Sequence, residues 1–234
     1  MDNAHCLVTG ANRGLGLEFA RQLLARGERV VATCRHPGKA TALNALAGEH
    51  PGRLRVLPLD VAAPRSIAEL ANELPLLDEA LSLRLLVNCA GVLHSGERFG
   101  AIDPAIVEDS FRTNAMGPLL VTQALAERLA DGAKVANISS VLGSIASLAR
   151  FGSPSYDISK AAQNMVTALL AKALAPRGIV VLALHPGWAQ TEMGGDNATV
   201  PAGDSVAGLL RVIDAAGVAD SGGFRDWRGE TLPW

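Results

Sequence analysis

TGANRGLG, residues Thr9 to Gly16, is the stretch that decides the fold. It follows a short apolar run, Cys6–Thr9, and leads directly into an amphipathic stretch, Leu15–Ala25. A glycine-rich turn between a strand and a helix is typical of the first βα unit of a dinucleotide-binding fold. The sequence therefore predicts a βαβ unit at its start.

The three glycines of this turn have distinct expected roles. Gly10 permits the tight turn, Gly14 lets the backbone approach a pyrophosphate, and Gly16 allows the helix to pack closely on the strand. Free N–H groups and the helix dipole then attract the anion. The spacing G-x-x-x-G-x-G departs from the common G-x-G-x-x-G, and an ordinary βα turn is the alternative. No Gly-Lys-Ser/Thr follows, which argues against a nucleoside-triphosphate loop. The other turn residues expected at the cofactor are Asn12, Arg13 and Leu15.

Apolar β-branched runs alternate with amphipathic stretches along the rest of the chain, as in a parallel sheet covered by helices. The strands are expected at Cys6–Thr9, Arg29–Cys34, Leu54–Pro58, Leu83–Asn88, Lys134–Ile138, Ile179–Leu184 and Gly223–Asp226. The helices are expected at Leu15–Ala25, Ala40–Ala47, Ser66–Glu73, Pro104–Leu129, Ser155–Ala173 and Asp204–Ala215. Asp103 and Asp204 are expected N-caps, and Gly27 and Gly178 stand where helices should end. We expect an α/β fold: one doubly wound Rossmann-type domain, residues 1–234, with a mostly parallel sheet of about seven strands and helices on both faces.

Composition narrows the class of protein. The 234 residues are 49% hydrophobic and carry 21 basic and 23 acidic side chains, with no run of five like charges. This balance argues against a nucleic-acid partner and a polybasic membrane anchor. No apolar stretch reaches the ~18 residues of a membrane helix, so we expect a soluble, cytoplasmic protein. Cys6, Cys34 and Cys89 form no ligand cluster, so no metal site is expected and the three are interpreted as buried apolar residues.

The end of the second strand predicts the cofactor. An acidic residue here would bind the ribose 2′-hydroxyl of NAD. The chain instead reads Thr33-Cys34-Arg35-His36, so Arg35, together with Arg13, offers guanidinium groups to a 2′-phosphate. We therefore expect a preference for NADP, with Arg35 dominant; the alternative is that both arginines are ordinary surface residues.

Tyr156 and Lys160 are the candidate catalytic pair. They are four residues apart at the start of a predicted helix and so share one face of it. An ammonium near a phenol favours the phenolate, which is expected to lower the pKa of Tyr156 toward useful acid/base chemistry. Ser140, at the end of the fifth strand, could donate a hydrogen bond to a substrate oxygen, and Ser139 is the competing candidate.

These motifs, taken in order along the whole chain, resemble the short-chain dehydrogenase/reductase family. The resemblance rests on Thr9-Gly10-x-x-x-Gly14-x-Gly16, Asp60-Val61, Asn88-Cys89-Ala90-Gly91, Asn114, Ser140, Tyr156-x-x-x-Lys160 and Pro186-Gly187 with Thr191. Ser140 and Tyr156 are sixteen residues apart rather than the thirteen typical of the family, which resembles small carbonyl reductases of the sniffer and C-factor type. The endings around Trp188 and Trp234 are similar to that subgroup as well.

The resemblance implies a role for each further motif. Asp60 and Val61 would lie beside the adenine, Asn88, Ala90 and Gly91 would line the cofactor floor, and Pro186, Gly187 and Thr191 would lie at the nicotinamide. Asn114 would complete a proton relay with Lys160 and water. The alternatives are helix capping for Asn114 and Thr191, and turn geometry for the Asn88–Gly91 and Pro186–Gly187 motifs.

The expected function is an NADP-preferring carbonyl reductase or alcohol dehydrogenase acting on a small-molecule substrate. A dinucleotide-binding regulatory or signalling protein is the alternative, because a fold does not fix a function. A sugar-nucleotide epimerase is disfavoured, because residues 192–234 are too few for its substrate domain. The sequence does not decide which residues form the wall of the substrate pocket. Candidates are His94, Leu142, Phe151, Trp188 and Met193, but their side chains could equally be core packing. Relatives often pair as a homodimer or homotetramer through long apolar helices.

Overall fold

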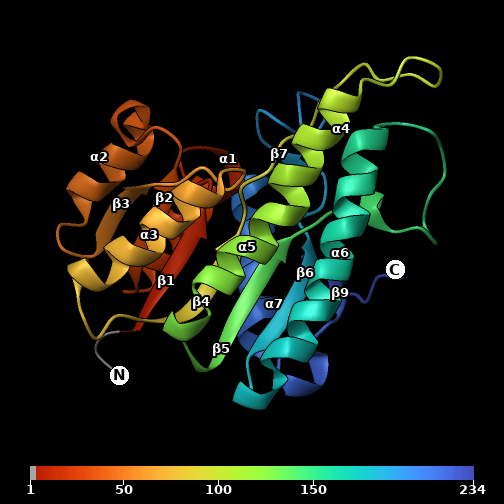
Figure 1. The fold of residues 1–234 in the computed structure, drawn as a ribbon. Helices are drawn as coiled ribbons and strands as arrows, with labels where there is room; N and C mark the ends of the chain where they lie inside the picture. Colours follow the sequence, from red (N-terminus) through yellow and green to blue (C-terminus); the bar gives the residue numbers. More distant parts are fainter. Residues whose placement is uncertain (1–3) are drawn as a thin grey trace.

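The computed structural model describes residues 4–234; residues 1–3 of the predicted domain lie outside the described residues. A seven-stranded sheet runs through the molecule in the order β3-β2-β1-β4-β5-β6-β9, and all its neighbouring strands are parallel (Figure 1). The strands are β1 (Ala4–Thr9), β2 (Arg29–Cys34), β3 (Leu54–Pro58), β4 (Ser82–Asn88), β5 (Leu129–Ile138), β6 (Val180–His185) and β9 (Phe224–Asp226). The predicted α/β fold and the predicted seventh strand are confirmed. A small second sheet pairs β7 (Ala189–Gln190) with β8 (Val200–Pro201).

Helices cover both faces of the main sheet (Figure 1). Their bounds are α1 (Gly14–Ala25), α2 (Thr41–Glu49), α3 (Pro64–Leu77), α4 (Pro104–Phe111), α5 (Gly117–Ala124), α6 (Pro154–Leu174) and α7 (Ala202–Ala215). Alternate strand residues point to opposite faces, which produces two apolar cores. Val8 and Val30 face the core under α1 and α7, while Leu7 and Val31 face the core under α3, α5 and α6. Both cores are built from near-continuous apolar strands, as a parallel sheet buried on both faces requires.

The long helix predicted at Pro104–Leu129 is confirmed in part, because the backbone stays helical from Pro104 to Ala124 but contains a π-helical turn and ends before Leu129. The segment is α4, then a π-helical turn at Arg112–Met116, then α5, and Leu129 begins strand β5 beside Leu83. A π-helical turn leaves the chain helical on both sides, so a helical sequence pattern does not by itself distinguish it from α-helix.

Two predicted caps have opposite outcomes. Asp103 caps α4, and its carboxylate accepts a hydrogen bond from the Ala105 amide at 2.9 Å. Asp204 is not a cap, because α7 begins at Ala202, two residues earlier, and Asp204 lies in its first turn. Gly27 and Gly178 follow helical turns with positive φ, as predicted.

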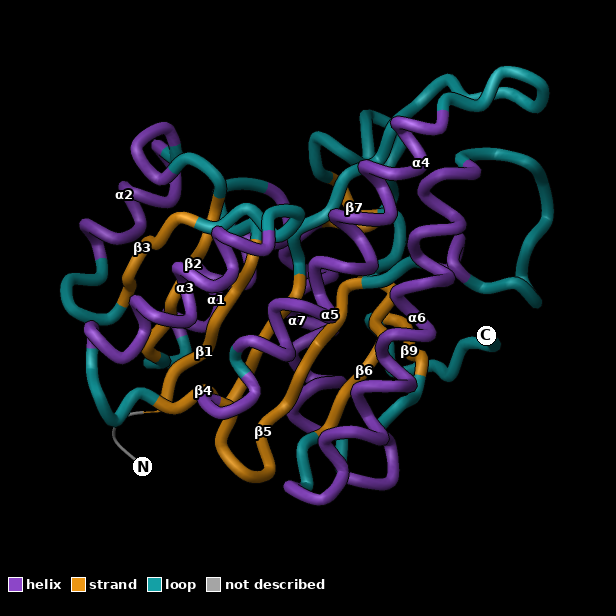
Figure 2. The backbone as a smooth tube through the Cα atoms, in the orientation of Figure 1, coloured by secondary structure: helices purple, strands orange, loops and turns teal. Residues whose placement is uncertain are grey.

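The strand order reverses at β1, whose neighbours are β2 and β4. Connections from these strands leave in opposite directions at their carboxyl ends, which is where ligands bind in open α/β sheets. The Thr9 hydroxyl fixes this edge, because it accepts hydrogen bonds from the amides of Cys89 at 3.0 Å and Ala90 at 3.1 Å. In Figure 2 the loops that follow the strands gather at this end.

The cysteine interpretation is confirmed in part. Cys6 and Cys34 are buried, while Cys89 is partly exposed at the end of β4, and all three are free thiols. Burial raises the pKa of Cys6 and of Cys89 to about 12, so both are neutral thiols. Within residues 4–234, no helix has the length and apolar character needed to cross a bilayer, and no three potential metal ligands gather in one place.

Candidate active site

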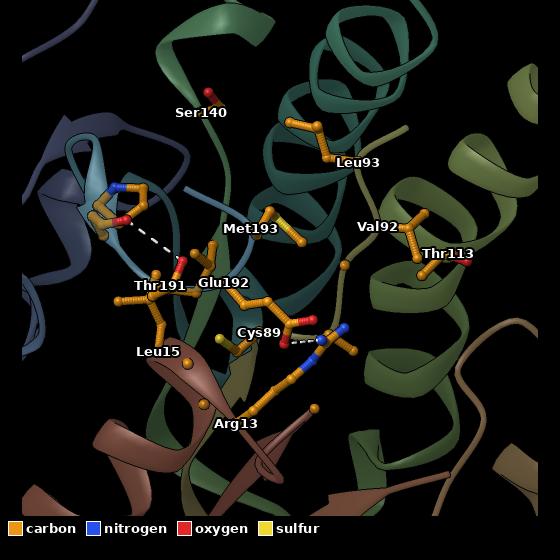
Figure 3. Close-up of a pocket in the computed structure, with 18 of the residues that line it drawn as sticks. Arg13, Leu15, Cys89, Val92, Leu93, Thr113, Ser140, Thr191, Glu192 and Met193 are labelled. Atoms are coloured by element: carbon orange, nitrogen blue, oxygen red, sulfur yellow. Dashed lines mark hydrogen bonds and ion pairs between the residues drawn. The ribbon is translucent and has the colours of Figure 1, made fainter. Parts of the chain in front are cut away.

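A cavity of about 870 Å³ lies at the carboxyl ends of the strands, and Figure 3 shows part of its wall. Its walls come from the glycine-rich turn, the ends of β2 and β3, and the segments after β4, β5 and β6. The predicted site residues that line it are Gly10, Asn12, Arg13, Gly14, Leu15, Gly16, Arg35, Asp60, Val61, Ala90, Gly91, Ser140, Tyr156, Lys160, Pro186, Gly187 and Thr191. Asn88 and Asn114 are fully buried and do not line it. The topology thus brings together residues spread over most of the chain.

The glycine-rich turn is shaped by backbone contacts that exclude side chains. A Cβ on Gly10 would lie 2.7 Å from the Cα of Ala90, and Gly10 has a φ of 67°. A Cβ on Gly16 would lie 2.3 Å from the carbonyl oxygen of Gly10. Both positions therefore require glycine, one for the turn and one for the packing of α1 against it.

The first turn of α1 suits a phosphate group. Arg13, its N-cap, has an extended backbone and makes no side-chain capping hydrogen bond, and the turn contains no acidic residue. The N–H groups at this end of the helix therefore lack a side-chain acceptor and face the cavity. These residues fit a pyrophosphate, which a dinucleotide would supply.

The end of β2 adds a cationic wall. Arg35, His36 and Lys39 line the cavity, and no carboxylate occurs between Thr33 and Ala40. Sequence reasoning identified Arg35 but missed Lys39, although the 3₁₀ turn at Pro37–Lys39 brings it within reach of the same space.

Arg13 differs from its predicted role. Its guanidinium forms an ion pair with Glu192 from the segment after β7, drawn as a dashed line in Figure 3. Both side chains are largely exposed. The prediction missed Glu192 because the contact joins positions 179 residues apart. Arg13 is therefore shared between this carboxylate and any phosphate nearby.

Asp60 and Val61 line the cavity after β3. The Asp60 side chain accepts a hydrogen bond from the Ala62 amide at 3.0 Å, and its own amide donates to the Ser66 hydroxyl at 3.0 Å. Asp60 thus holds the turn into α3, and this turn presents the buried Val61 to the cavity.

Asn88 lies beneath the floor rather than in it. Its amide nitrogen donates to Thr122 on α5 at 3.1 Å and to Asn137 on β5 at 2.8 Å. Asn137 in turn donates to Thr167 on α6 at 2.9 Å. This buried chain ties the helices to the sheet below Ala90 and Gly91.

Tyr156 and Lys160 share one face of α6, as predicted. The Lys160 Nζ lies 5.5 Å from the centre of the Tyr156 ring. It donates hydrogen bonds to the Ile138 carbonyl at 2.7 Å and to the Gln163 Oε1 at 2.8 Å. The ammonium is therefore fixed between β5 and α6, with the phenol one helical turn away.

The predicted lowering of the Tyr156 pKa is wrong for the protein in this form. Burial raises the pKa of Tyr156 to about 12, although a hydrogen bond with Ser140 opposes the change. Burial likewise lowers the pKa of Lys160 to about 8. Desolvation outweighs local attraction at both groups. At neutral pH the phenol keeps its proton, which is the state that an acid catalyst needs.

The two serines are used differently. The Ser139 hydroxyl donates to the Asn164 Oδ1 on α6 at 2.6 Å and is buried. The Ser140 hydroxyl accepts from the Leu142 amide at 3.1 Å and hydrogen-bonds with Tyr156. Ser140 therefore adjoins the phenol, whereas the Ser139 hydroxyl already has its partner.

Asn114 lies in the middle of the π-helical turn, so it is not a helix cap. Its Oδ1 accepts from the Val92 amide at 2.8 Å, and its Nδ2 donates to the Val92 carbonyl and the Ser159 hydroxyl, both at 2.9 Å. A Cβ on Gly91 would lie 3.2 Å from the Asn114 Oδ1 and 3.9 Å from the Lys160 Nζ. Asn114 thus holds the segment after β4 against α6, close to the ammonium.

The segment after β6 closes the cavity from the other side. The Thr191 hydroxyl accepts from the Gly194 amide at 3.1 Å, so it shapes the turn that carries Met193. His185, which sequence reasoning missed, also lines the cavity. Burial lowers its pKa to about 4, and its Nδ1 is buried without a hydrogen-bond partner among the described residues. The side chain is therefore a neutral imidazole.

The proposed substrate wall divides into two groups. Leu142, Trp188 and Met193 line the cavity, whereas His94 and Phe151 do not. His94 instead pairs with Asp109 at 2.8 Å, and Phe151 packs edge-on against Phe99. Further lining residues that sequence reasoning missed are Val92, Leu93, Asp109, Thr113 and Arg150; Figure 3 shows Val92, Leu93 and Thr113 on one side and Ser140 on another.

Comparison with known proteins identifies the family to which this chain belongs. The model of the short chain dehydrogenase family matches residues 4–200. The chain belongs to this family. This short-chain dehydrogenase is 45% identical to the C-signal of Myxococcus xanthus over 152 residues, which are 64% of this chain and 92% of that protein.

Solved structures extend the likeness to the whole fold. An NADPH-bound carbonyl reductase from chicken fatty liver superposes with a TM-score of 0.93 at 38% identity, covering 98% of each chain. The carbonyl reductase Sniffer of D. melanogaster has a TM-score of 0.93 at 29% identity, covering 98% of this chain and 99% of its own. The predicted family and subgroup resemblance are confirmed.

Proposed function

We propose that this short-chain dehydrogenase is an NADP-dependent carbonyl reductase whose acid catalyst is Tyr156. The observation that carries the proposal is that Ser140, Tyr156 and Lys160 line the same cavity as the cationic wall of Arg35 and Lys39. Similar proteins of known structure are carbonyl reductases, and one is described with NADPH bound. Bound NADPH would supply the hydride.

The reaction follows from the protonation states. A carbonyl carbon that accepts hydride leaves an alkoxide, which needs a proton. Tyr156, protonated at neutral pH, donates it, and the Ser140 hydroxyl stabilises the developing charge with a hydrogen bond. The Lys160 ammonium then stabilises the phenolate that remains. Asn114 is the positioning residue, and a water beside Lys160 would return the proton to the phenolate.

Cofactor preference rests on charge. We propose that Arg35 binds the 2′-phosphate and that Lys39 assists, while Arg13 contributes less because Glu192 competes for it. The proposed cofactor contacts otherwise keep the predicted set: Gly10, Asn12, Arg13, Gly14, Leu15, Gly16, Asp60, Val61, Ala90, Gly91, Tyr156, Lys160, Pro186, Gly187 and Thr191. Asn88 supports this floor from beneath. One domain, residues 1–234, would thus hold both cofactor and substrate.

The test uses purified protein with NADPH or NADH and a panel of small aldehydes and ketones, read by absorbance of the reduced nicotinamide. We expect a higher kcat/KM with NADPH, and the Tyr156→Phe variant should lose turnover by at least ~10²-fold while still binding NADPH. Full turnover in Tyr156→Phe would refute the assignment of the acid.

A signalling role is the second candidate, favoured by the 45% identity to a protein named C-signal. A signalling protein could bind NADPH in this cavity with no turnover. Tight NADPH binding, together with inactivity on every carbonyl in the panel, would favour this candidate over the reductase.

We also propose a homodimer through α6 and the neighbouring π-helical turn. Ile158, Met165 and Leu169 are exposed apolar side chains on α6, and their spacing of seven and four residues places them on one face of the helix. Met116, in the π-helical turn that packs against α6, is also exposed. Exposed apolar side chains on one helix face are typical of an interaction face. Light scattering at micromolar concentration tests this; a mass of one chain, 24.3 kDa, would refute it.

A further inference from the structure

The loop between Ser140 and Tyr156 carries a charged residue into the cavity wall. Arg150 lines the cavity, and it lies on the connection between the two residues proposed to contact the reacting oxygen. The cationic residues Arg35 and Lys39 lie on a different element, after β2. Arg150 is therefore not needed to explain the phosphate-binding end.

The guanidinium of Arg150 has no close carboxylate. None of the ion pairs formed among residues 4–234 includes it. Asp157 is near enough for Arg150 to lower its pKa, yet burial dominates and raises the pKa of that carboxyl. Glu97 uses both carboxylate oxygens on the amide and hydroxyl of Ser155. Asp109, which also lines the cavity, is paired with His94 at 2.8 Å.

The loop that carries Arg150 is held at both ends. The Ala146 amide donates to the Trp234 carbonyl at 2.9 Å. Phe151, next to Arg150, packs edge-on against Phe99 with ring centroids 5.8 Å apart. Figure 1 shows this loop and the one after β4 projecting side by side beyond the sheet. The position of Arg150 at the wall is thus set by contacts on either side of it.

Three apolar side chains line the cavity together with Arg150. Leu142, Trp188 and Met193 line the cavity with half of their surfaces, or nearly so, exposed. An apolar wall with one guanidinium suits a ligand that has an apolar body and an anionic group at its far end, because a carboxylate matches the guanidinium fork.

We propose that the physiological substrate is a carbonyl compound that bears a carboxylate remote from the reacting carbon, and that Arg150 binds this carboxylate. This inference rests on the proposed function and adds the substrate class to it. Arg150 is a specificity-determining residue here: it contacts the far end of the substrate and takes no part in hydride or proton transfer.

The test compares two aldehydes that differ in one group, 4-carboxybenzaldehyde and its methyl ester, methyl 4-formylbenzoate. Their intrinsic reactivities differ, but that difference cancels when the same ratio of kcat/KM values, acid over ester, is compared between variants. In Arg150→Met the ratio should fall about tenfold, which is the effect expected for the loss of one charge-assisted hydrogen bond. The fall should arise from a higher KM for the acid. Arg150→Glu should lower it further, and Arg150→Lys should retain part of it.

Arg211→Met is the matched control, because Arg211 is an exposed arginine on α7 that does not line the cavity. It should leave the ratio unchanged. A ratio that stays within twofold of wild type in both Arg150→Met and Arg150→Glu would overturn the inference, while turnover of the ester would leave the proposed function standing.

If neither aldehyde consumes NADPH, the proposed function fails on these substrates and binding decides the inference. Calorimetry of 4-carboxybenzaldehyde and of its ester on the NADP⁺-loaded protein then gives the same comparison. Tighter binding of the acid that is lost in Arg150→Met supports the inference, and equal binding of both compounds to wild type refutes it.

Discussion

Replacement of Lys160 by methionine should remove one pH-dependent cost to the stability of the protein. Burial lowers the pKa of Lys160 from 10.5 to about 8. In the unfolded chain the same amine keeps its ordinary pKa, so between about pH 8 and 10.5 the unfolded state binds more protons than the folded state. The free energy of unfolding of wild type must therefore rise with pH across this window.

The magnitude follows from the size of the shift. Each pKa unit corresponds to ~1.4 kcal/mol, so the full window is worth about 3 kcal/mol. Below pH 8 the folded protein carries this cost in full, and above pH 10.5 the cost is gone. Lys160→Met has no amine to titrate, so its stability lacks this component.

The assay is urea denaturation of wild type and Lys160→Met at half-unit steps from pH 7 to 10.5. The difference in unfolding free energy, wild type minus variant, should rise by about 3 kcal/mol across the series. Lys172→Met, an exposed lysine on the same helix, is the control and should give a flat difference. A flat difference for Lys160→Met as well would refute the claim that the ammonium is held against a desolvation penalty.

Two further predictions concern the reaction. Ser140→Ala should lower kcat by ~10²-fold or more, since it removes the donor at the developing oxyanion. Ser139→Ala should retain most of the activity, because the Ser139 hydroxyl is bound to Asn164. If steady-state kinetics showed the larger loss of kcat in Ser139→Ala, the two serines would exchange roles. Arg35→Asp should raise the KM for NADPH at least tenfold and leave the KM for NADH nearly unchanged, because a carboxylate repels a 2′-phosphate and accepts a hydrogen bond from a 2′-hydroxyl. Equal changes in KM for both cofactors would contradict the proposed role of Arg35.

Local rules in the sequence were enough for the parts of the site that a single element creates. The glycine-rich turn could be predicted because its backbone requires glycine locally: Gly10 and Gly14 have positive φ, and a Cβ on Gly16 would clash with the Gly10 carbonyl oxygen. Tyr156 and Lys160 could be paired because four residues make nearly one turn of helix. The parallel sheet of about seven strands followed from the βαβ pattern, and the structure agrees with it.

Features that depend on distant packing could not be predicted. The π-helical turn around Asn114 was not predicted, because a local sequence pattern does not distinguish such a turn from α-helix. The choice between Ser139 and Ser140 depends on which hydroxyl meets Asn164, a contact that spans 25 residues. The Arg13–Glu192 pair joins two residues that line the cavity from distant parts of the chain, and the charge of each residue alone gives no sign of its partner.

The pKa prediction failed for a reason that bears on direction of catalysis. We expected the charge of Lys160 to dominate at Tyr156, yet burial sets the pKa of both groups, in opposite senses. A phenol with a pKa of about 12 holds its proton at neutral pH, so the resting site is poised to donate rather than to accept. Reduction of a carbonyl uses this state directly. Oxidation of an alcohol by the same proposed mechanism would need the phenolate, so this proton would first have to leave Tyr156.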